Sequence, residues 1–82
     1  MEKNEILAAI CEVLQEFNRF NVPISPQTRL EEDLSIDSLG IMVLISELEK
    51  RFRIRIDHQT ELRRQNFRTV GTVCEFLKRK SE

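Results

Sequence analysis

Two neighbouring residues near the middle of the chain, Asp37 and Ser38, place a carboxylate beside a hydroxyl at the start of an expected helix. A serine at a helix start exposes its hydroxyl, and a phosphodiester formed there would lie near unpaired backbone N–H groups and the positive end of the helix dipole. At a solvated position that proximity contributes only about 0.3–1 kcal/mol. An isolated Asp-Ser pair is most often an ordinary helix cap, so the surrounding sequence has to decide its meaning.

The Ser38 hydroxyl does not fit the nucleophile of a hydrolase. The chain lacks the Gly-x-Ser-x-Gly turn that exposes such a serine, and its only histidine, His58, lies about twenty positions away in a polar segment. We expect His58 to be a surface residue without a role. Because no general base is evident, we expect no enzyme activity.

The two cysteines, Cys11 and Cys74, do not indicate a metal site, because they lack the close spacing and the accompanying histidines of such sites. Two cysteines alone also make a poor disulfide scaffold. We expect both to be small apolar side chains, and we expect no metal in the free protein.

The elements before Ser38 are a helix and a long connection. Asn4 is expected to cap the helix, which should run for about four turns and fade near Asn18. Its apolar residues recur at helical spacing: Ile6, Ile10, Val13, Leu14 and Phe17. The connection, residues 18–36, is long for a small domain, and such connections are often functional. Leu30 and Leu34 are expected to form one buried turn in it, with residues 31–33 in solvent.

A second helix is expected to begin at Asp37 or Ser38 and to end at about Phe52. The predicted core stripe of this helix consists of Ile41, Met42, Ile45, Leu48 and Phe52. Leu39 and Val43 fall outside the stripe, one turn apart and beside Ser38, where a free monomer gains nothing from apolar groups. Either a loop or short helix covers them, or they form a surface for a partner protein.

After the second helix the alternation Phe52-Arg-Ile-Arg-Ile56 predicts an extended segment laid against the core. A short helix capped by Thr60 is expected to reach about Gln65. Thr69 is expected to cap a last helix with the apolar residues Val70, Val73, Phe76 and Leu77. The predicted fold is all-α, a small four-helix bundle of three longer helices and one short helix, with a long loop between helices 1 and 2, in a single domain of residues 1–82.

The segment Leu34-Ser35-Ile36-Asp37-Ser38-Leu39 resembles the Leu-x-x-Asp-Ser-Leu signature at which acyl carrier proteins receive phosphopantetheine. The motif lies near mid-chain, after a long loop and at the start of an amphipathic helix. The likeness extends to Phe52-Arg-Ile-Arg-Ile56 and to Asn66-Phe-Arg-Thr-Val70, so it spans nearly the whole chain. The chain is therefore identified as a member of the acyl carrier protein family.

This resemblance implies a carrier of acyl intermediates, held as thioesters on a 4′-phosphopantetheine arm that comes from coenzyme A and is attached to Ser38. The pathway implied is fatty-acid, polyketide or other specialised biosynthesis. Asp37 is implied to help hold Mg²⁺ in the complex with the phosphopantetheinyl transferase. Further expected partners are a ligase or acyltransferase that loads the arm and downstream acyl-processing enzymes, with Leu39, Val43 and Glu47 as contacts.

Two departures from the family pattern concern the partners and the cargo. Fatty-acid members are usually strongly acidic along the second helix and beyond, whereas this chain has Lys50, Arg51, Arg53, Arg55, Arg63, Arg64 and Arg68. The difference indicates a specialised stand-alone carrier with dedicated partners. Gly40 after Ser-Leu resembles D-alanyl carriers, so an aminoacyl cargo is one alternative, and a non-carrier helical interaction module is another. Ser35-Ile36-Asp37 does not match the Gly-Gly-x that peptidyl carriers often place before the serine.

Charge is divided along the chain, whose formal net charge is −1. Residues 1–49 carry 10 acidic and 3 basic residues, whereas residues 50–82 carry 4 acidic and 10 basic ones, so the two halves should present opposite electrostatic faces. Nucleic-acid binding has little support, because the pI is near 5.9 and no stacking aromatics accompany the arginines. With no apolar run of membrane-spanning length and no basic leader, we expect a cytoplasmic monomer without membrane insertion.

Overall fold

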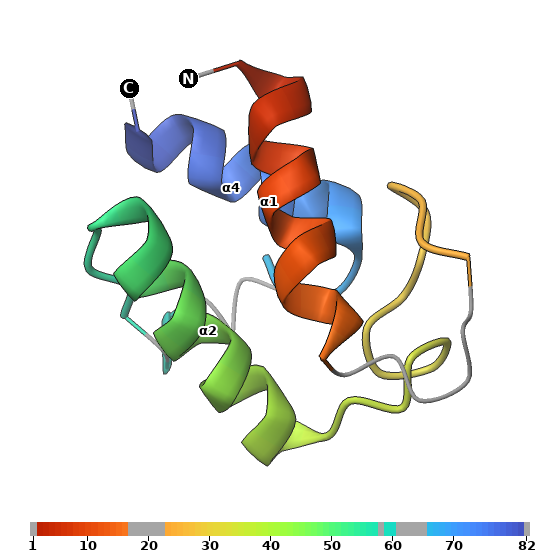
Figure 1. Ribbon diagram of the computed structural model, residues 1–82. Helices are drawn as coiled ribbons and strands as arrows, with labels where there is room; N and C mark the ends of the chain where they lie inside the picture. Colours follow the sequence, from red (N-terminus) through yellow and green to blue (C-terminus); the bar gives the residue numbers. More distant parts are fainter. Residues whose placement is uncertain (1, 17–22, 58, 61–65, 82) are drawn as a thin grey trace.

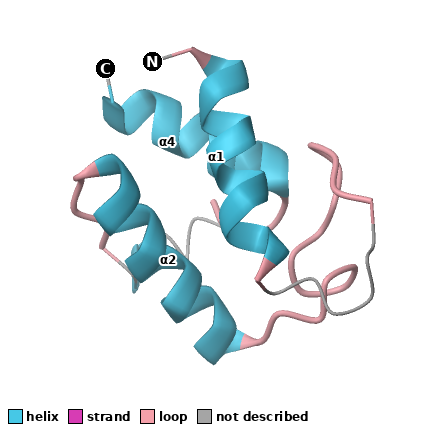
Figure 2. Ribbon diagram, in the orientation of Figure 1, coloured by secondary structure: helices cyan, strands magenta, loops and turns pink. Residues whose placement is uncertain are grey.

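The computed structural model describes residues 2–16, 23–57, 59–60 and 66–81, and within these ranges it has three helices and no strand (Figures 1 and 2). Helix α1 spans Lys3–Gln15, α2 spans Ser38–Phe52 and α4 spans Val70–Ser81. α1 packs against both α2 and α4, and the start of α1 lies at the same end of the molecule as the end of α4 (Figure 1). None of the described helices is long and apolar enough to cross a membrane.

The all-α class agrees with the structure, but the prediction of a four-helix bundle is wrong, because the described residues form three helices. The predicted cap of the short helix is also different. The backbone N–H of Thr60 donates to Asp57 Oδ1 at 3.1 Å, so Asp57 supplies the capping oxygen. Residues 61–65, over which the short helix was expected, lie outside the described residues.

Helix α1 begins two residues earlier than predicted, at Lys3 and not at Glu5, so Asn4 is not its cap. Glu2 precedes the helix and gives no side-chain cap, and its carbonyl oxygen accepts from the Ile6 N–H at 3.1 Å. Glu and Lys are better helix formers than Asn, which favours this earlier start. The buried face of α1 consists of Ile6, Ile10, Val13 and Leu14, as predicted. Phe17 and Asn18 lie outside the described residues.

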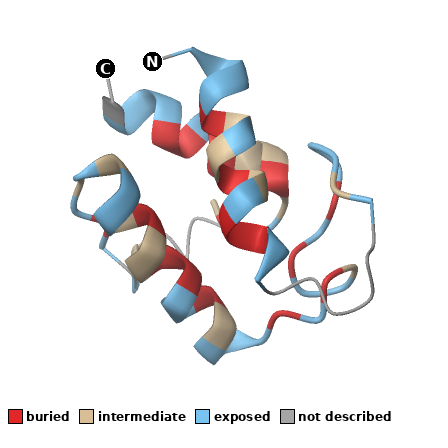
Figure 3. Ribbon diagram, in the orientation of Figure 1, coloured by how far each residue is buried: buried red, intermediate tan, exposed pale blue. Residues whose placement is uncertain are grey.

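Helix α2 has the predicted bounds but not the predicted core stripe. Its buried residues are Ile41, Leu44, Ile45 and Leu48. Met42 is 45% exposed, so its placement in the core is wrong, and Phe52 is only half-buried. Met42 follows Ile41 by one residue, which turns it about 100° around the helix, whereas Leu44 returns to the buried side. Figure 3 shows the buried side of α2 turned toward α1.

Beyond α2 the predicted alternation is confirmed. Ile56 is buried and Ile54 half-buried, while Arg53 and Arg55 are exposed. At the other end of the core, α4 buries the four predicted residues together with Cys74, and Phe76 meets the Phe67 ring edge-on at 5.7 Å between centroids. Leu30 and Leu34 of the long connection are buried in the same core, as expected.

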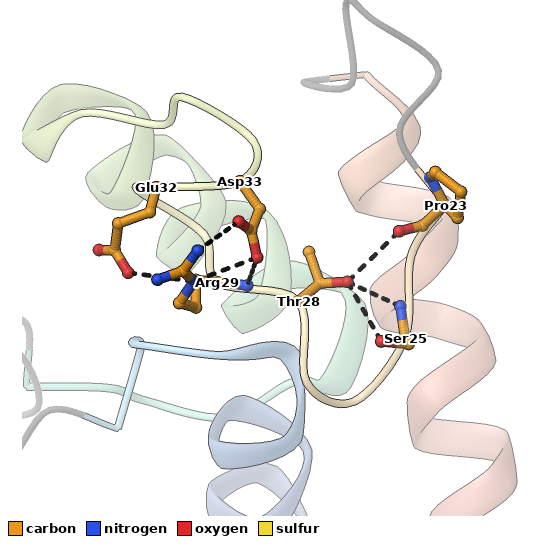
Figure 4. Close-up of polar contacts among 6 residues, drawn as sticks. All are labelled: Pro23, Ser25, Thr28, Arg29, Glu32 and Asp33. Atoms are coloured by element: carbon orange, nitrogen blue, oxygen red, sulfur yellow. Dashed lines mark hydrogen bonds and ion pairs between the residues drawn. The ribbon is translucent and has the colours of Figure 1, made fainter.

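The connection between α1 and α2 closes over the start of α4. The carbonyl oxygens of Thr28 and Pro26 accept from the N–H groups of Val70 and Gly71, at 2.9 and 2.8 Å. Within the connection, Thr28 Oγ1 accepts from the Ser25 N–H at 2.8 Å (Figure 4).

An ion cluster and two backbone bonds complete this connection. Arg29 pairs with Glu32 at 3.5 Å and with Asp33 at 3.0 Å (Figure 4). The Leu30 N–H donates to the Arg68 carbonyl at 3.0 Å, and the Leu30 carbonyl accepts from the Ile36 N–H at 3.1 Å. The connection is therefore fixed to the core at the point where the chain enters α2.

Candidate functional site

Of the two residues that the sequence offered as caps of α2, Asp37 is the cap and Ser38 is the first residue of the helix. Asp37 has an extended backbone, and its Oδ1 accepts from the Gly40 N–H at 2.8 Å. Its carbonyl oxygen accepts from the Ile41 N–H at 2.9 Å. Ser38 is exposed, and its hydroxyl has no hydrogen-bond partner among the described residues. The hydroxyl is thus available to a group from outside the chain.

The backbone around this hydroxyl suits an anion. Within the described ranges, the N–H groups of Ser38 and Leu39 have no acceptor, because the cap formed by Asp37 satisfies only Gly40 and Ile41. Unpaired N–H groups at a helix start and the positive end of the helix dipole both favour negative charge. A phosphodiester on Ser38 Oγ therefore fits this position, and it requires no core side chain to move.

A groove of about 420 Å³ opens beside Ser38. Its walls come from the connection, from α2 and from the segment before α4: Glu31, Glu32, Ile36, Asp37, Ser38, Ile41, Phe67 and Arg68. The groove combines an apolar floor with a charged rim, which is compatible with a flexible arm that carries both amides and methylenes. Three His, Cys, Asp or Glu side chains do not gather anywhere in the described part of the chain to hold a metal ion.

One side of α2 next to Ser38 is apolar and exposed. Leu39 is 72% exposed, Val43 is 52% exposed, and Met42 lies beside them. We call these three residues the apolar face. No described loop or helix buries them, so the alternative of a covering segment is not met in the described part of the structure. Leu39 and Val43 were predicted to lie outside the core stripe, whereas Met42 was not. Met42 lies about 100° around the helix from the buried Ile41, which places it on the exposed side.

Glu47 lies one turn beyond Val43 and is half-buried. Its Oε1 is 3.8 Å from Lys50 Nζ, so the carboxylate is loosely paired within its own helix. An exposed pair at this distance is weak and leaves both groups open to other partners.

Both cysteines are free thiols, and neither belongs to the site. Cys74 is buried, with its Sγ 3.6 Å from the Lys3 carbonyl oxygen, and Cys11 is half-buried. Burial raises the pKa of both thiols, which keeps them protonated and unreactive. His58, expected to have no role, lies outside the described residues.

Comparison with known proteins agrees with this geometry. A family model described as a phosphopantetheine attachment site matches residues 4–77, from α1 through the start of α2 into α4. The acyl carrier protein of Exiguobacterium sibiricum is 34% identical over 79 residues, which cover 94% of this chain and 95% of that protein. That of Myxococcus xanthus is 28% identical over 76 residues, covering 92% of each. That of Onion yellows phytoplasma is 41% identical over 54 residues, covering 66% and 67%.

Proposed function

Because this chain belongs to the acyl carrier protein family, we propose that Ser38 Oγ is the atom to which its 4′-phosphopantetheine arm is attached. The protein is an acyl carrier, which holds acyl groups as thioesters on that arm. The observation that supports Ser38 is its exposed hydroxyl at the start of α2, next to unpaired N–H groups and outside the cap. Since members of this family carry groups for other enzymes, we further propose that the protein catalyses no reaction itself.

Attachment would form an ester bond between Ser38 Oγ and the phosphorus that bears pantetheine in coenzyme A. The pyrophosphate bond breaks, the adenosine bisphosphate leaves, and the hydroxyl proton passes to a base of the transferase. Asp37 is proposed to bind Mg²⁺ during this step. Its Oδ1 is engaged by Gly40, whereas its Oδ2 has no partner in the described ranges and is a suitable oxygen ligand for a hard cation.

The apolar face is proposed as the contact for the transferase, for the ligase or acyltransferase that loads the arm, and for downstream acyl-processing enzymes. Glu47 is proposed as a polar contact at its edge. Partners that act on a group attached to Ser38 must approach this end of α2, where Leu39 and Val43 are exposed. Both cysteines are free thiols, which supports a reducing compartment such as the cytoplasm as the place of work.

The attachment site is tested by incubating the purified protein with coenzyme A, Mg²⁺ and a promiscuous phosphopantetheinyl transferase, followed by intact mass measurement. Wild type should gain one phosphopantetheine and Ser38→Ala none. Ser35→Gly is the matched control, because it removes a hydroxyl three residues away at a position whose φ of 56° suits glycine. This control should be modified like wild type. A modified Ser38→Ala variant, or an unmodified wild type, contradicts the proposal.

The contact role of the apolar face is tested with Leu39→Glu and Val43→Glu. Because both side chains are exposed, each change should alter the free energy of unfolding by less than about 0.5 kcal/mol. The KM of the transferase for each variant should nevertheless rise, since a charge replaces an apolar contact. Large thermal destabilisation would instead show that these residues belong to the core.

A further inference from the structure

The end of α2 that lies far from Ser38 carries exposed cations. The side chain of Lys50 is 77% exposed, and Arg53 and Arg55 are exposed as well. Within the described residues, neither of these two arginines contacts an acidic side chain, and the pair formed by Lys50 with Glu47 is loose. Arg51 differs, because it is paired with Glu12 of α1. We call Lys50, Arg53 and Arg55 the cationic end.

The fold holds the cationic end in a fixed place. Arg53 ends α2 with a left-handed backbone, at φ 55°. Glu49 then anchors the following segment twice, because its carbonyl oxygen accepts from the Ile54 N–H at 3.2 Å and its Oε2 accepts from the Ile56 N–H at 3.0 Å. Since Ile56 is buried, Arg53 and Arg55 project from an anchored stretch of chain. Their charges are therefore presented at a defined position.

The apolar face and Lys50 lie along one side of α2, and Arg53 and Arg55 follow directly after the end of this helix. Leu39, Val43 and Lys50 are separated by four and seven residues, which places them on one stripe of an α-helix. At a rise of about 1.5 Å per residue, Lys50 lies about 16 Å along the axis from Leu39. A protein that covers the apolar face along this stripe also meets the cationic end. Protein interfaces commonly join an apolar centre to a polar rim in this way.

The opposite end of α2 has the opposite charge. Glu31, Glu32 and Asp37 line the groove beside Ser38, at the end of the connection that leads into α2. Figure 1 shows that this connection and the last turn of α2 lie at opposite ends of the helix. The groove also has one cation, Arg68, so a partner with a single acidic patch is attracted more strongly at the cationic end than at the start of α2, and one orientation along the helix is favoured.

We infer that the apolar face and the cationic end form one docking surface for the enzyme that loads the arm, and that this enzyme has an acidic patch about 16 Å from the apolar contact next to its active-site entrance. The inference rests on the proposed function, because a loading enzyme requires an arm on Ser38. The charge of the cationic end selects the acidic partner, and the apolar face fixes where Ser38 enters. A nucleic acid fits the same surface poorly, because the described phenylalanines are buried or half-buried and offer no exposed ring for stacking.

The test uses the holo-protein and the loading enzyme purified from the native host by following thioester formation on the holo-protein. The double variant Arg53→Glu/Arg55→Glu should raise the KM for the carrier about tenfold at low salt, with little change in kcat, because charges at an interface rim act mainly on encounter. Arg79→Glu/Lys80→Glu is the matched control. It makes the same charge change at exposed positions near the end of another helix, and it should alter KM less than about twofold.

Salt and a milder variant sharpen the test. The difference between the two double variants should shrink at about 1 M salt, where the Debye length falls to about 3 Å. Arg53→Gln/Arg55→Gln neutralises without reversing charge, and it should raise KM by a smaller factor, which keeps the inference testable if the reversal variant unfolds. Equal effects of the two charge reversals, or no effect of either, would overturn the inference. So would salt-sensitive binding of duplex DNA or single-stranded RNA that Arg53→Glu/Arg55→Glu abolishes while its KM stays normal.

Failure of the proposed function is visible earlier and separately. If wild type takes no phosphopantetheine, the intact mass shows it before any KM is measured, and the docking inference falls with the attachment site. If wild type is modified and loaded but KM does not respond to the cationic end, only the docking inference falls.

Discussion

The starts of α2 and α4 contain similar residues but differ in the hydrogen bonding of their first backbone N–H groups. At the start of α4, Thr69 Oγ1 accepts from the Thr72 N–H at 3.1 Å, and the Val70 and Gly71 N–H groups donate to carbonyl oxygens of the connection. At the start of α2, the Asp37 cap satisfies Gly40, while the Ser38 N–H has no acceptor in the described part of the chain. The free N–H groups of a first helical turn can be satisfied by the fold or left for a ligand.

Burial follows the same division. Val70, the first residue of α4, is fully buried, whereas Ser38 and Leu39, the first two residues of α2, are exposed. The start of α4 therefore holds the bundle together, and the start of α2 is kept outside it. We call the start of α4 the closed start and the start of α2 the open start. Substitutions at the closed start should lower the free energy of unfolding, whereas substitutions at the open start should affect modification and partner binding.

The largest expected difference between the two starts comes from their glycines. A Cβ added at Gly71 would lie 2.9 Å from the Pro26 carbonyl oxygen, which is backbone, so Gly71→Ala must displace the connection. We expect a loss of about 2 kcal/mol in the free energy of unfolding. A Cβ at Gly40 would lie 2.6 Å from Cγ2 of Ile36, a buried β-branched side chain that must shift, although this contact is with a side chain and not with the backbone of another segment.

Gly40→Ala should also be destabilising, by about 1 kcal/mol, which is less than for Gly71→Ala because no backbone of another segment has to move. Urea unfolding of both variants at neutral pH measures the difference. A greater loss for Gly40→Ala than for Gly71→Ala would break the distinction between an open and a closed start.

The next largest effect concerns the caps. Thr69→Ala removes the hydrogen bond from the Thr72 N–H to Thr69 Oγ1 and leaves only the reciprocal bond from the Thr69 N–H to Thr72 Oγ1. A loss of about 1–2 kcal/mol in the free energy of unfolding is expected. Asp37→Ala should cost about 1 kcal/mol or less, because its cap is exposed to water. Thermal unfolding compares the two.

Asp37→Asn separates capping from cation binding. Its amide oxygen can still accept from the Gly40 N–H, so stability should stay close to wild type, while an amide nitrogen replaces the oxygen proposed to bind Mg²⁺. The rate of modification by the transferase, followed by mass over time, should fall. Modification at the wild-type rate would argue against the role proposed for Asp37.

The smallest expected effect is a pH dependence of stability that comes from the connection between α1 and α2, which covers the start of α4. The hydrogen bond from the Arg29 side chain, followed by that from the Arg29 N–H, holds the pKa of Asp33 below its ordinary value of 3.8. A carboxyl group with a lowered pKa in the folded state stabilises the fold above its unfolded pKa, and this stabilisation is lost as the pH falls through the folded value. Wild type and Asp33→Asn should differ slightly at pH 7 and converge once the pH has fallen below the lowered pKa of Asp33. A difference that persists at low pH would mean that the ion pair is not its cause.

Sequence predicted the local features well. Thr69 was expected as a cap, and Asp37 was one of two candidates beside Ser38, because Asp, Ser and Thr side chains commonly accept from the first N–H groups of a helix. The burial of Leu30 and Leu34 followed from their spacing by one helical turn. The exposure of the Ser38 hydroxyl was expected from its position at the start of a helix, and the structure agrees.

Features that depend on contacts distant in sequence were not predicted. The closure of α4 uses the backbone carbonyls of Pro26 and Thr28, which every residue type possesses, so no side chain announces it. The anchoring of Ile56 by the Glu49 side chain was not predicted either, because the two residues are seven positions apart and meet only where the chain turns after α2. Met42 was misplaced because both flanks of the buried stripe carry apolar residues, and packing against α1 decides which flank is covered. The count of four helices depended on a short helix from Thr60 to about Gln65. In the structure Asp57 supplies the capping oxygen to Thr60, and residues 61–65 lie outside the described residues.

Because Asp37 and not Ser38 closes the first turn of α2, a substituent on the Ser38 oxygen breaks no bond that holds the bundle. The folded domain should therefore have the same structure in the loaded and empty forms of the carrier, and its surface should not differ between one cargo and another. Enzymes downstream must then distinguish one cargo from another at the tip of the arm itself, while the docking surface on α2 selects which enzyme approaches.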